Sequence, residues 1–312
     1  MSDLSAAVMV FNVGWACTFD KIKLQDGLFI ESLVTSKISP LYEQICLEKG
    51  IHYGDPFTDG IVIEMNSSWL DIGFWSYHTP ASHISTICNC ISIFLSSPLP
   101  QYTLLYSNDD FDSIHELPID LNNNYDLYEF LSAHIDNYSQ KINDSLSKCG
   151  RKMEIEYFVG DKLIGNIITT LENLRKFGSN SKIQNSFSYY FNAWRAYQIE
   201  HTCINLSIIL ESLFSPAGNS ELNHQISFYT TQFLGGTPEE KQEIFKIVKK
   251  FYSLRSKIVH GSLASTDDLS VTVPVMFMLC SEILQKLLTD KNLLDTFSNN
   301  EKRATLFRSW LF

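Results

Sequence analysis

The first 120 residues alternate between short apolar segments and polar breaks that contain Pro, Gly or Asp. Segments rich in β-branched and aromatic residues predict strands, here over residues 11–19, 21–32 and 60–77. Two intervening segments, 39–50 and 83–96, are typical of short helices. This part of the chain is therefore expected to be mixed and strand-rich.

From residue 125 onward, apolar residues recur at helical spacing. The pattern predicts helices over 125–147, 161–177, 182–214, 221–234, 238–258, 268–288 and 292–308, with one short strand at 152–159. Thr237, Pro238 and two following glutamates are typical of a helix start, and Gly261 of a helix end. The apolar residues at 310–312 are expected to be buried.

The expected fold class is α+β, with a mixed α/β domain over residues 1–155 and an all-α helical bundle over 156–312. Charge changes at the same place. Residues 1–150 hold 6 Lys and Arg against 19 Asp and Glu, whereas residues 151–312 hold 18 against 16. The acidic first part should repel polyanions, so we expect any nucleic-acid contact in the second part.

Composition also limits the location and the cofactors. No apolar run approaches the roughly 18–20 residues of a membrane span. The seven cysteines are scattered and lack the spacing of zinc ligands or of a redox pair. We expect a reduced cytoplasmic protein that contacts no membrane and holds no metal or other cofactor.

One short segment contains the candidate catalytic residues. Residues 251–261 read FYSLRSKIVHG, in which Arg255 is followed by four residues and then His260. Cleavage of RNA without a metal needs proton transfer, for which histidine is suited, and stabilisation of phosphate charge, for which arginine is suited. The spacing alone is expected about 0.5 times by chance in this composition, and a second pair, Arg195 and His201, exists.

The context is more specific than the spacing. Tyr-x-x-Arg-Ser-x-Ile-Val-His-Gly, preceded by a helix ending Leu-Glu-Ser-Leu-Phe at 210–214, resembles the HEPN superfamily and its Apea-like branch. The resemblance covers about residues 161–288. It implies a metal-independent endoribonuclease, with Arg255 and His260 catalytic and with two copies forming one cleft in a homodimer. The products would carry a 2′,3′-cyclic phosphate and a 5′-hydroxyl.

The resemblance also implies a bacterial toxin or anti-phage (abortive infection) effector that cleaves tRNA or other RNA. Residues 1–155 would then sense a trigger or bind a regulatory protein. Around the catalytic pair, the expected supporting residues are Glu211, Ser256 and Tyr252, and the expected RNA-binding residues are Lys249, Lys250 and Lys257. These lysines belong to a stretch, 241–260, with six basic residues and one acidic residue.

Each feature has a structural alternative. The lysines could form a solvated helix face, His260 could cap its helix, and Arg255 could form a structural ion pair with Glu211. Tyr252 could belong to the core. The alternative function is therefore a non-catalytic HEPN scaffold or nucleotide-binding module within a larger complex. A third hypothesis is a bundle that a separate nucleotidyltransferase neutralises.

Overall fold

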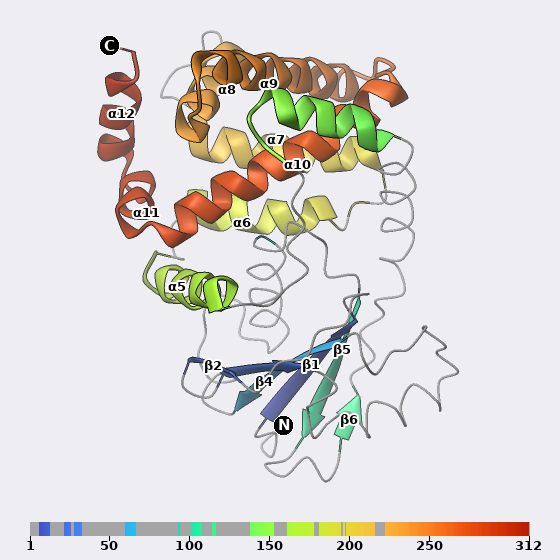
Figure 1. Cartoon of the computed structure of the whole chain (residues 1–312), viewed down its shortest axis with the longest axis vertical. Coiled ribbons are helices and arrows are strands. Elements are labelled where there is room, and N and C mark those ends of the chain that lie inside the picture. The colour runs from blue at the N-terminus through green and yellow to red at the C-terminus, as the bar shows by residue number, and fades with distance from the viewer. Residues whose placement is uncertain are drawn as a thin grey trace. The chain divides into compact units, whose positions relative to one another are not determined.

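The computed structural model describes residues 6–12, 22–25, 28–32, 60–66, 93, 101–107, 114–116, 138–152, 161–177, 181–194, 196, 198–215 and 222–311 (Figure 1). The chain forms two compact units. The strand-containing unit comprises residues 1–125 and 156–171, and the helical unit comprises residues 126–155 and 172–312. Each unit therefore takes residues from both sides of position 155.

The described strands of the strand-containing unit pair in one antiparallel sheet. They are β1 (Ala6–Asn12), β2 (Ile22–Gln25), β3 (Leu28–Ser32), β4 (Gly60–Asn66), β5 (Gln101–Ser107) and β6 (Ile114–Glu116), in the order β2-β3-β4-β1-β5-β6. The central strand β1 sets the register: Ala6 lies opposite Asn66 of β4 and Ser107 of β5. Val and Ile are frequent in β4, as suits a pleated sheet.

Helices form the rest of the described chain. The first spans 138–148, and it is followed by α5 (Asp161–Phe177), α6 (Ser181–Trp194), α7 (Ile199–Phe214), α8 (Leu222–Leu234), α9 (Pro238–Val259), α10 (Thr266–Thr289), α11 (Lys291–Ser298) and α12 (Asn300–Ser309). In Figure 1, α8 and α9 lie side by side, as do α6 and α7. These pairings place the end of α9 against α7, where the candidate site lies.

The core of the helical unit is built around α7 and α10. Fifteen of the 24 residues of α10 are buried, and nine of the 16 residues of α7. By length and composition α10 is the one described helix that could cross a membrane, but 72% of its most apolar window is buried inside the protein. The described cysteines, Cys149, Cys203 and Cys280, are free and buried in this unit.

The expected α+β fold class is wrong for the part of the chain that is described almost continuously. Residues 138–309 are helical and contain no strand among the described positions. The described strands before them amount to 33 residues, which does not define a mixed domain. The charge step near residue 150 also does not mark where the helical unit begins, because net charge reflects the solvent surface and not the packing. Ile142 and Leu146 are fully buried in the helical unit, on the acidic side of that step.

A second correction concerns the expected long helix over 182–214. The structure divides it into α6 and α7, which pack on each other, and the hydroxyl of Thr202 donates to the Ala193 carbonyl across the break. Neither Gly nor Pro occurs between residues 194 and 199. Because no local sequence signal marks the break, the apolar periodicity predicted one continuous helix.

The carboxyl end of the chain also differs from the prediction that residues 310–312 are buried. Trp310 is half-buried against Phe307 and Tyr229, but Leu311 is 56% exposed. Four other expectations fall outside the described residues. They concern Phe312, the strand at 152–159 beyond Lys152, the helix at 39–50, and the helix at 83–96 apart from Ile93.

Candidate functional site

The candidate site lies at the carboxyl end of α9, and both ends of this helix are capped as the sequence predicts. Thr237 and Glu240 form a capping box: each side chain bonds the backbone N–H of the other. At the other end, the Gly261 N–H donates to the Ile258 carbonyl and the Ser262 N–H to the Lys257 carbonyl. These two hydrogen bonds, with Gly261 at φ +71°, end the helix at Val259, directly before His260.

Arg255 lies in the last turns of α9 and faces α7. Its Nη2 is 3.4 Å from Oε1 of Glu211, and both side chains are about one-third exposed. Its Nε is buried and has no hydrogen-bond partner among the described residues. A guanidinium carries five N–H donors, and buried donors are normally paired. Arg255 is therefore held by one ion pair and keeps unused donors near solvent.

Glu211 is positioned by α7 to meet this arginine. Burial raises the pKa of its carboxyl above the ordinary value, and the nearby Arg255 opposes that rise without cancelling it. The same arginine acts on Cys203, two turns earlier on α7, where burial raises the pKa of the thiol to about 12. The contact between α7 and α9 thus places a partly buried carboxylate beside a cation.

His260 is the residue that follows α9. It is exposed, its backbone N–H donates to the Ser256 carbonyl, and its φ and ψ are −90° and 9°. No hydrogen bond or ion pair links its side chain to Arg255 among the described residues. Because residues five apart on an α-helix point about 140° away from each other, one copy of α9 presents the two side chains in different directions.

The two remaining supporting residues differ in placement. Tyr252 is 2% exposed, its hydroxyl reaches toward the Ser207 carbonyl of α7 at 3.4 Å, and its ring packs edge-on against Phe251. Burial raises the pKa of the Tyr252 phenol well above its ordinary value. A buried ring cannot stack on a nucleic-acid base, so Tyr252 supports the site from the core. Ser256 is half-buried beside Arg255.

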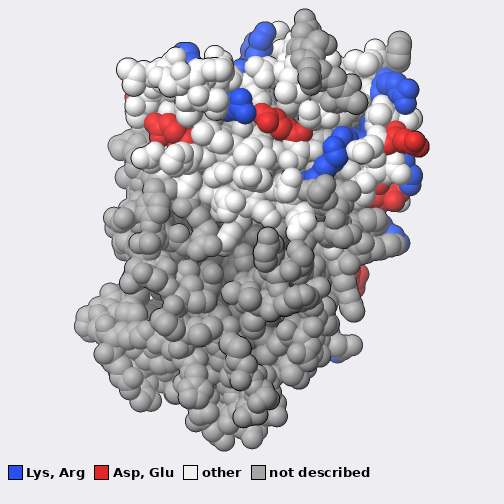
Figure 2. All heavy atoms as spheres, turned by 180° about the vertical axis from the view of Figure 1, so that it is seen from behind, with Lys and Arg blue, Asp and Glu red and all other residues white. Residues whose placement is uncertain are grey.

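The three expected RNA-binding lysines are exposed on α9. Lys250 pairs with Asp268 of α10 at 2.6 Å, whereas Lys249 and Lys257 make no ion pair among the described residues. The Lys250 hydrogen bond lowers the pKa of Asp268 below its ordinary value. On the face drawn in Figure 2, basic and acidic side chains are interspersed over the helical unit and form no continuous basic field.

Sequence reasoning missed two features around this end of α9. Asp268 neutralises one of the lysines, and its position in the first turn of a helix was the available signal. Val259 and Leu263 are 50% and 98% exposed on either side of His260. Local sequence carries no signal for their exposure, because both are ordinary core residue types.

The second Arg–His pair falls only partly on the described residues. His201 is exposed on α7, and Arg195 lies outside the described residues. Among the described residues, no three His, Cys, Asp or Glu side chains gather as metal ligands would. The helical unit thus supplies an arginine, an acid, a histidine and two unpaired lysines around one helix end. Comparison of the chain with family models, with curated proteins and with solved structures finds no match.

Proposed function

We propose that the chain is a metal-independent endoribonuclease that acts as a homodimer, with Arg255 and His260 as its catalytic residues. The observation that carries the proposal is the state of Arg255. It is one-third exposed, ion-paired to a single carboxylate at 3.4 Å, and leaves a buried Nε without a partner among the described residues. A phosphate oxygen at the exposed part of this side chain would accept from donors that Glu211 leaves unused, although the buried Nε is out of its reach.

The chemistry needs no co-reactant. His260 takes the proton from the ribose 2′-hydroxyl, and the 2′-oxygen attacks the adjacent phosphorus. The new O–P bond forms as the bond to the 5′-oxygen breaks, and the leaving oxygen takes up the proton that His260 removed from the 2′-hydroxyl. Arg255 stabilises the added negative charge on the phosphate oxygens during this exchange. The products are a 2′,3′-cyclic phosphate and a 5′-hydroxyl.

A second copy completes the site in this proposal. Within one chain the Arg255 and His260 side chains make no contact among the described residues, and α9 directs them about 140° apart. Val259 and Leu263, which flank His260, are exposed apolar side chains of the kind that protein interfaces cover. Two helix ends packed together would bring Arg255 of one copy toward His260 of the other.

Lys249 and Lys257 would bind the RNA backbone. They are exposed and make no ion pair among the described residues, unlike Lys250, which is paired with Asp268, although the charge of Lys257 also acts on Asp268. Their charge holds the strand without reading its sequence. The RNA class is cellular RNA, with tRNA as the first candidate, and its cleavage would arrest growth as a toxin or anti-phage effector does.

The test is RNA cleavage by the full-length protein in EDTA, with total tRNA as the substrate. Wild type should give fragments that end in a 2′,3′-cyclic phosphate. Replacing His260→Ala removes the general base, and we expect cleavage to fall by about 10²–10⁴-fold. Arg255→Ala should lower it by a comparable factor, since it removes the donors aimed at the phosphate.

Arg308→Ala is the matched control, because Arg308 is exposed on α12 and its side chain contacts only Ala304 and Thr305 of its own helix. It should cleave like wild type. Equal cleavage by wild type, His260→Ala and Arg255→Ala would contradict the proposal. In cells, growth arrest by wild type and its loss in His260→Ala would extend the result to the proposed role.

One observation favours the second candidate, a non-catalytic scaffold or nucleotide-binding module. The Arg255–Glu211 pair joins α9 to α7 and is partly buried, as a structural ion pair would be. In that case Arg255→Ala should lower stability and leave RNA unaltered. Nucleotide binding by wild type without any cleavage, in the same EDTA assay, would support this candidate over the first.

A further inference from the structure

The connectivity of the chain singles out residues 126–155. They belong to the helical unit, although the chain before them, through 125, and the chain after them, over 156–171, belong to the strand-containing unit. The segment is therefore joined covalently to the strand-containing unit at both of its ends.

The described part of this segment is a short helix over 138–148 followed by residues 149–152. Ile142, Leu146 and Cys149 are fully buried, and most of the other residues are exposed or half-buried. An isolated helix needs about 12–15 residues to be even marginally stable in water. This helix consequently depends on its attachment to the helical unit, and three apolar side chains are a small attachment.

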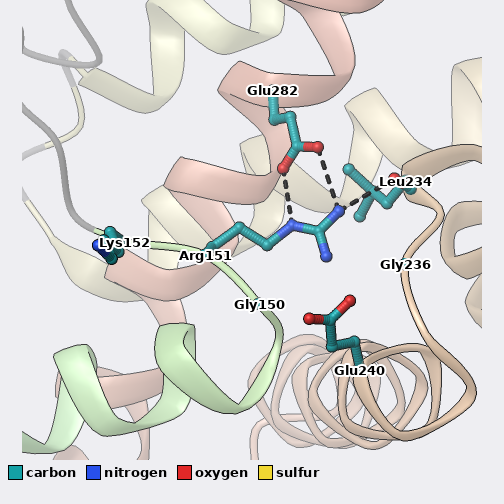
Figure 3. A pocket seen from close by; sticks show the side chains of 7 residues that line it. All are labelled: Gly150, Arg151, Lys152, Leu234, Gly236, Glu240 and Glu282. Carbon is teal, nitrogen blue, oxygen red and sulfur yellow. Dashed lines mark hydrogen bonds and ion pairs between the residues drawn. The ribbon is translucent and has the colours of Figure 1, made fainter.

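Arg151 fastens the carboxyl end of the segment to α10 and to the end of α8. Its Nε and Nη2 donate to the two carboxylate oxygens of Glu282 at 2.9 and 3.1 Å, and Nη2 also donates to the Leu234 carbonyl at 3.0 Å (Figure 3). Nη1 donates to the Cys149 carbonyl. Such a bidentate arginine–carboxylate pair fixes both distance and orientation.

The ionised state of Glu282 favours this contact. Burial would raise the pKa of its carboxyl, but hydrogen bonds from Arg151 and Lys286 outweigh burial and hold it below the ordinary value. Lys286 also donates to the Leu234 carbonyl at 2.9 Å. The half-buried carboxylate is thus stabilised as an ion by these two cations.

The backbone around this contact is closely fitted. Gly150, at φ +70°, passes so near the carboxylate of Glu240 that a Cβ there would overlap Oε1. Gly236, at φ +120°, approaches the same carboxylate from the turn between α8 and α9. Figure 3 shows Glu240 rising from α9 toward Arg151 across a pocket of about 560 Å³. The segment end therefore touches the first turn of α9 as well.

The other end of the segment is fastened near the candidate site. The Tyr138 hydroxyl donates to Oδ1 of Asp267 at 2.5 Å, in the first turn of α10. Its neighbour Asp268 pairs with Lys250 of α9, and the connection between α9 and α10 carries His260. Asp267 and Glu282 are fifteen residues apart, so the two attachments lie about 22 Å apart along α10.

We propose that residues 138–151 are a detachable strap of the helical unit that is fastened to α10. The strap is fastened by Arg151–Glu282 at one end and by Tyr138–Asp267 at the other. When the Arg151 contact opens, the strap helix unfolds while the helical unit stays folded. Unfolding of the strap then removes the Tyr138–Asp267 hydrogen bond and so affects the connection between α9 and α10. The inference concerns the fold and does not depend on RNA cleavage.

The test is amide hydrogen exchange of the full-length protein, read by mass spectrometry segment by segment. In Arg151→Ala we expect amides of 142–148 to exchange at least about tenfold faster than in wild type, because their helix has lost its main attachment. Amides in the buried parts of α7 and α10 should keep their wild-type rates. Tyr138→Phe should speed exchange in the first strap residues and in 262–268 only.

Glu282→Gln is the gentler companion variant, because it keeps a hydrogen-bond acceptor and removes the charge; its strap should exchange at an intermediate rate. Arg308→Ala, whose side chain contacts only its own helix, should match wild type throughout. Unchanged strap exchange in Arg151→Ala would overturn the proposal. So would a uniform increase across α7, α9 and α10, because Arg151 would then be an ordinary part of one cooperative core.

Discussion

The chemistry of the candidate site depends on how single charged side chains are solvated. Arg255 and Glu211 meet at 3.4 Å, both partly withdrawn from water, and neither partner is fully satisfied by the other. A guanidinium carries five N–H donors, and this single contact at 3.4 Å uses few of them. The incomplete pairing is what distinguishes Arg255 from Arg151, whose guanidinium is bonded to a carboxylate at two points and to two carbonyls.

Glu211 makes stability depend on pH in a defined direction. Because burial raises its folded-state pKa, the folded protein holds this proton more tightly than the unfolded chain. The stability of wild type should therefore fall, relative to Glu211→Gln, as pH rises from about 4.3, the ordinary glutamate pKa, through the raised folded value. The difference should reach about 1 kcal/mol or less, because the pair is partly solvated.

Urea unfolding of both proteins across this pH range measures the effect. Glu243→Gln is the control, because Glu243 lies on the outer side of α9 and pairs with Lys246 on the surface. Its stability should not diverge from wild type in the same way. If wild type instead gained stability over Glu211→Gln with rising pH, then attraction to Arg255 would dominate burial.

The ends of α9 show how local signals define an element. The capping box at Thr237 and the left-handed Gly261 delimit a helix that the residue pattern predicts almost to the residue. By contrast, nothing in residues 194–199 signals the division between α6 and α7. Helix caps are formed by hydrogen bonds between residues a few positions apart. The turn between α6 and α7 instead exists because the amphipathic faces of the two helices pack on each other.

Gly261→Ala tests the cap. No atom lies within 4 Å of a Cβ placed there, so the cost is backbone strain at φ +71° alone, about 1 kcal/mol of unfolding free energy. Gly165→Ala, also in open space but inside α5 and without a positive φ, should instead stabilise by about 0.5–1 kcal/mol. Thermal or urea unfolding distinguishes the two signs, and stabilisation by both variants would refute the cap.

The charge distribution of the whole protein bears on its proposed partner. The acidic excess lies in residues 1–150, while Lys249 and Lys257 stand unpaired on α9 among the described residues. If these two lysines bind phosphates of single-stranded RNA, replacing both by Gln should lower the slope of log affinity against log salt by about 1.4. Fluorescence anisotropy of a labelled RNA at several salt concentrations measures that slope.

Lys291→Gln with Arg308→Gln removes the same charge from α11 and α12, beyond the far end of α10. This charge-matched control should leave the slope unchanged. Equal changes in both double variants would mean that RNA responds to net charge and not to α9, and the proposed binding face would be wrong.

Much of the helical part of the structure can be predicted from the sequence alone. The bounds of α5, α8, α9 and α10, the caps of α9, and the spacing of Arg255 and His260 follow from periodicity and from residues a few positions apart. These features depend on interactions within one or two helical turns, which nearby residues specify.

Tertiary packing decided the rest. It buried Tyr252, left Leu263 exposed, set Arg255 on Glu211 across 44 positions, and took residues 126–155 into the helical unit despite their acidic neighbourhood. Each outcome depends on which distant surfaces meet, and burial of apolar area is non-directional, so no local pattern encodes the partner. The expected fold class and the expected single helix over 182–214 failed for this reason, whereas the bounds of α8, α9 and α10 did not.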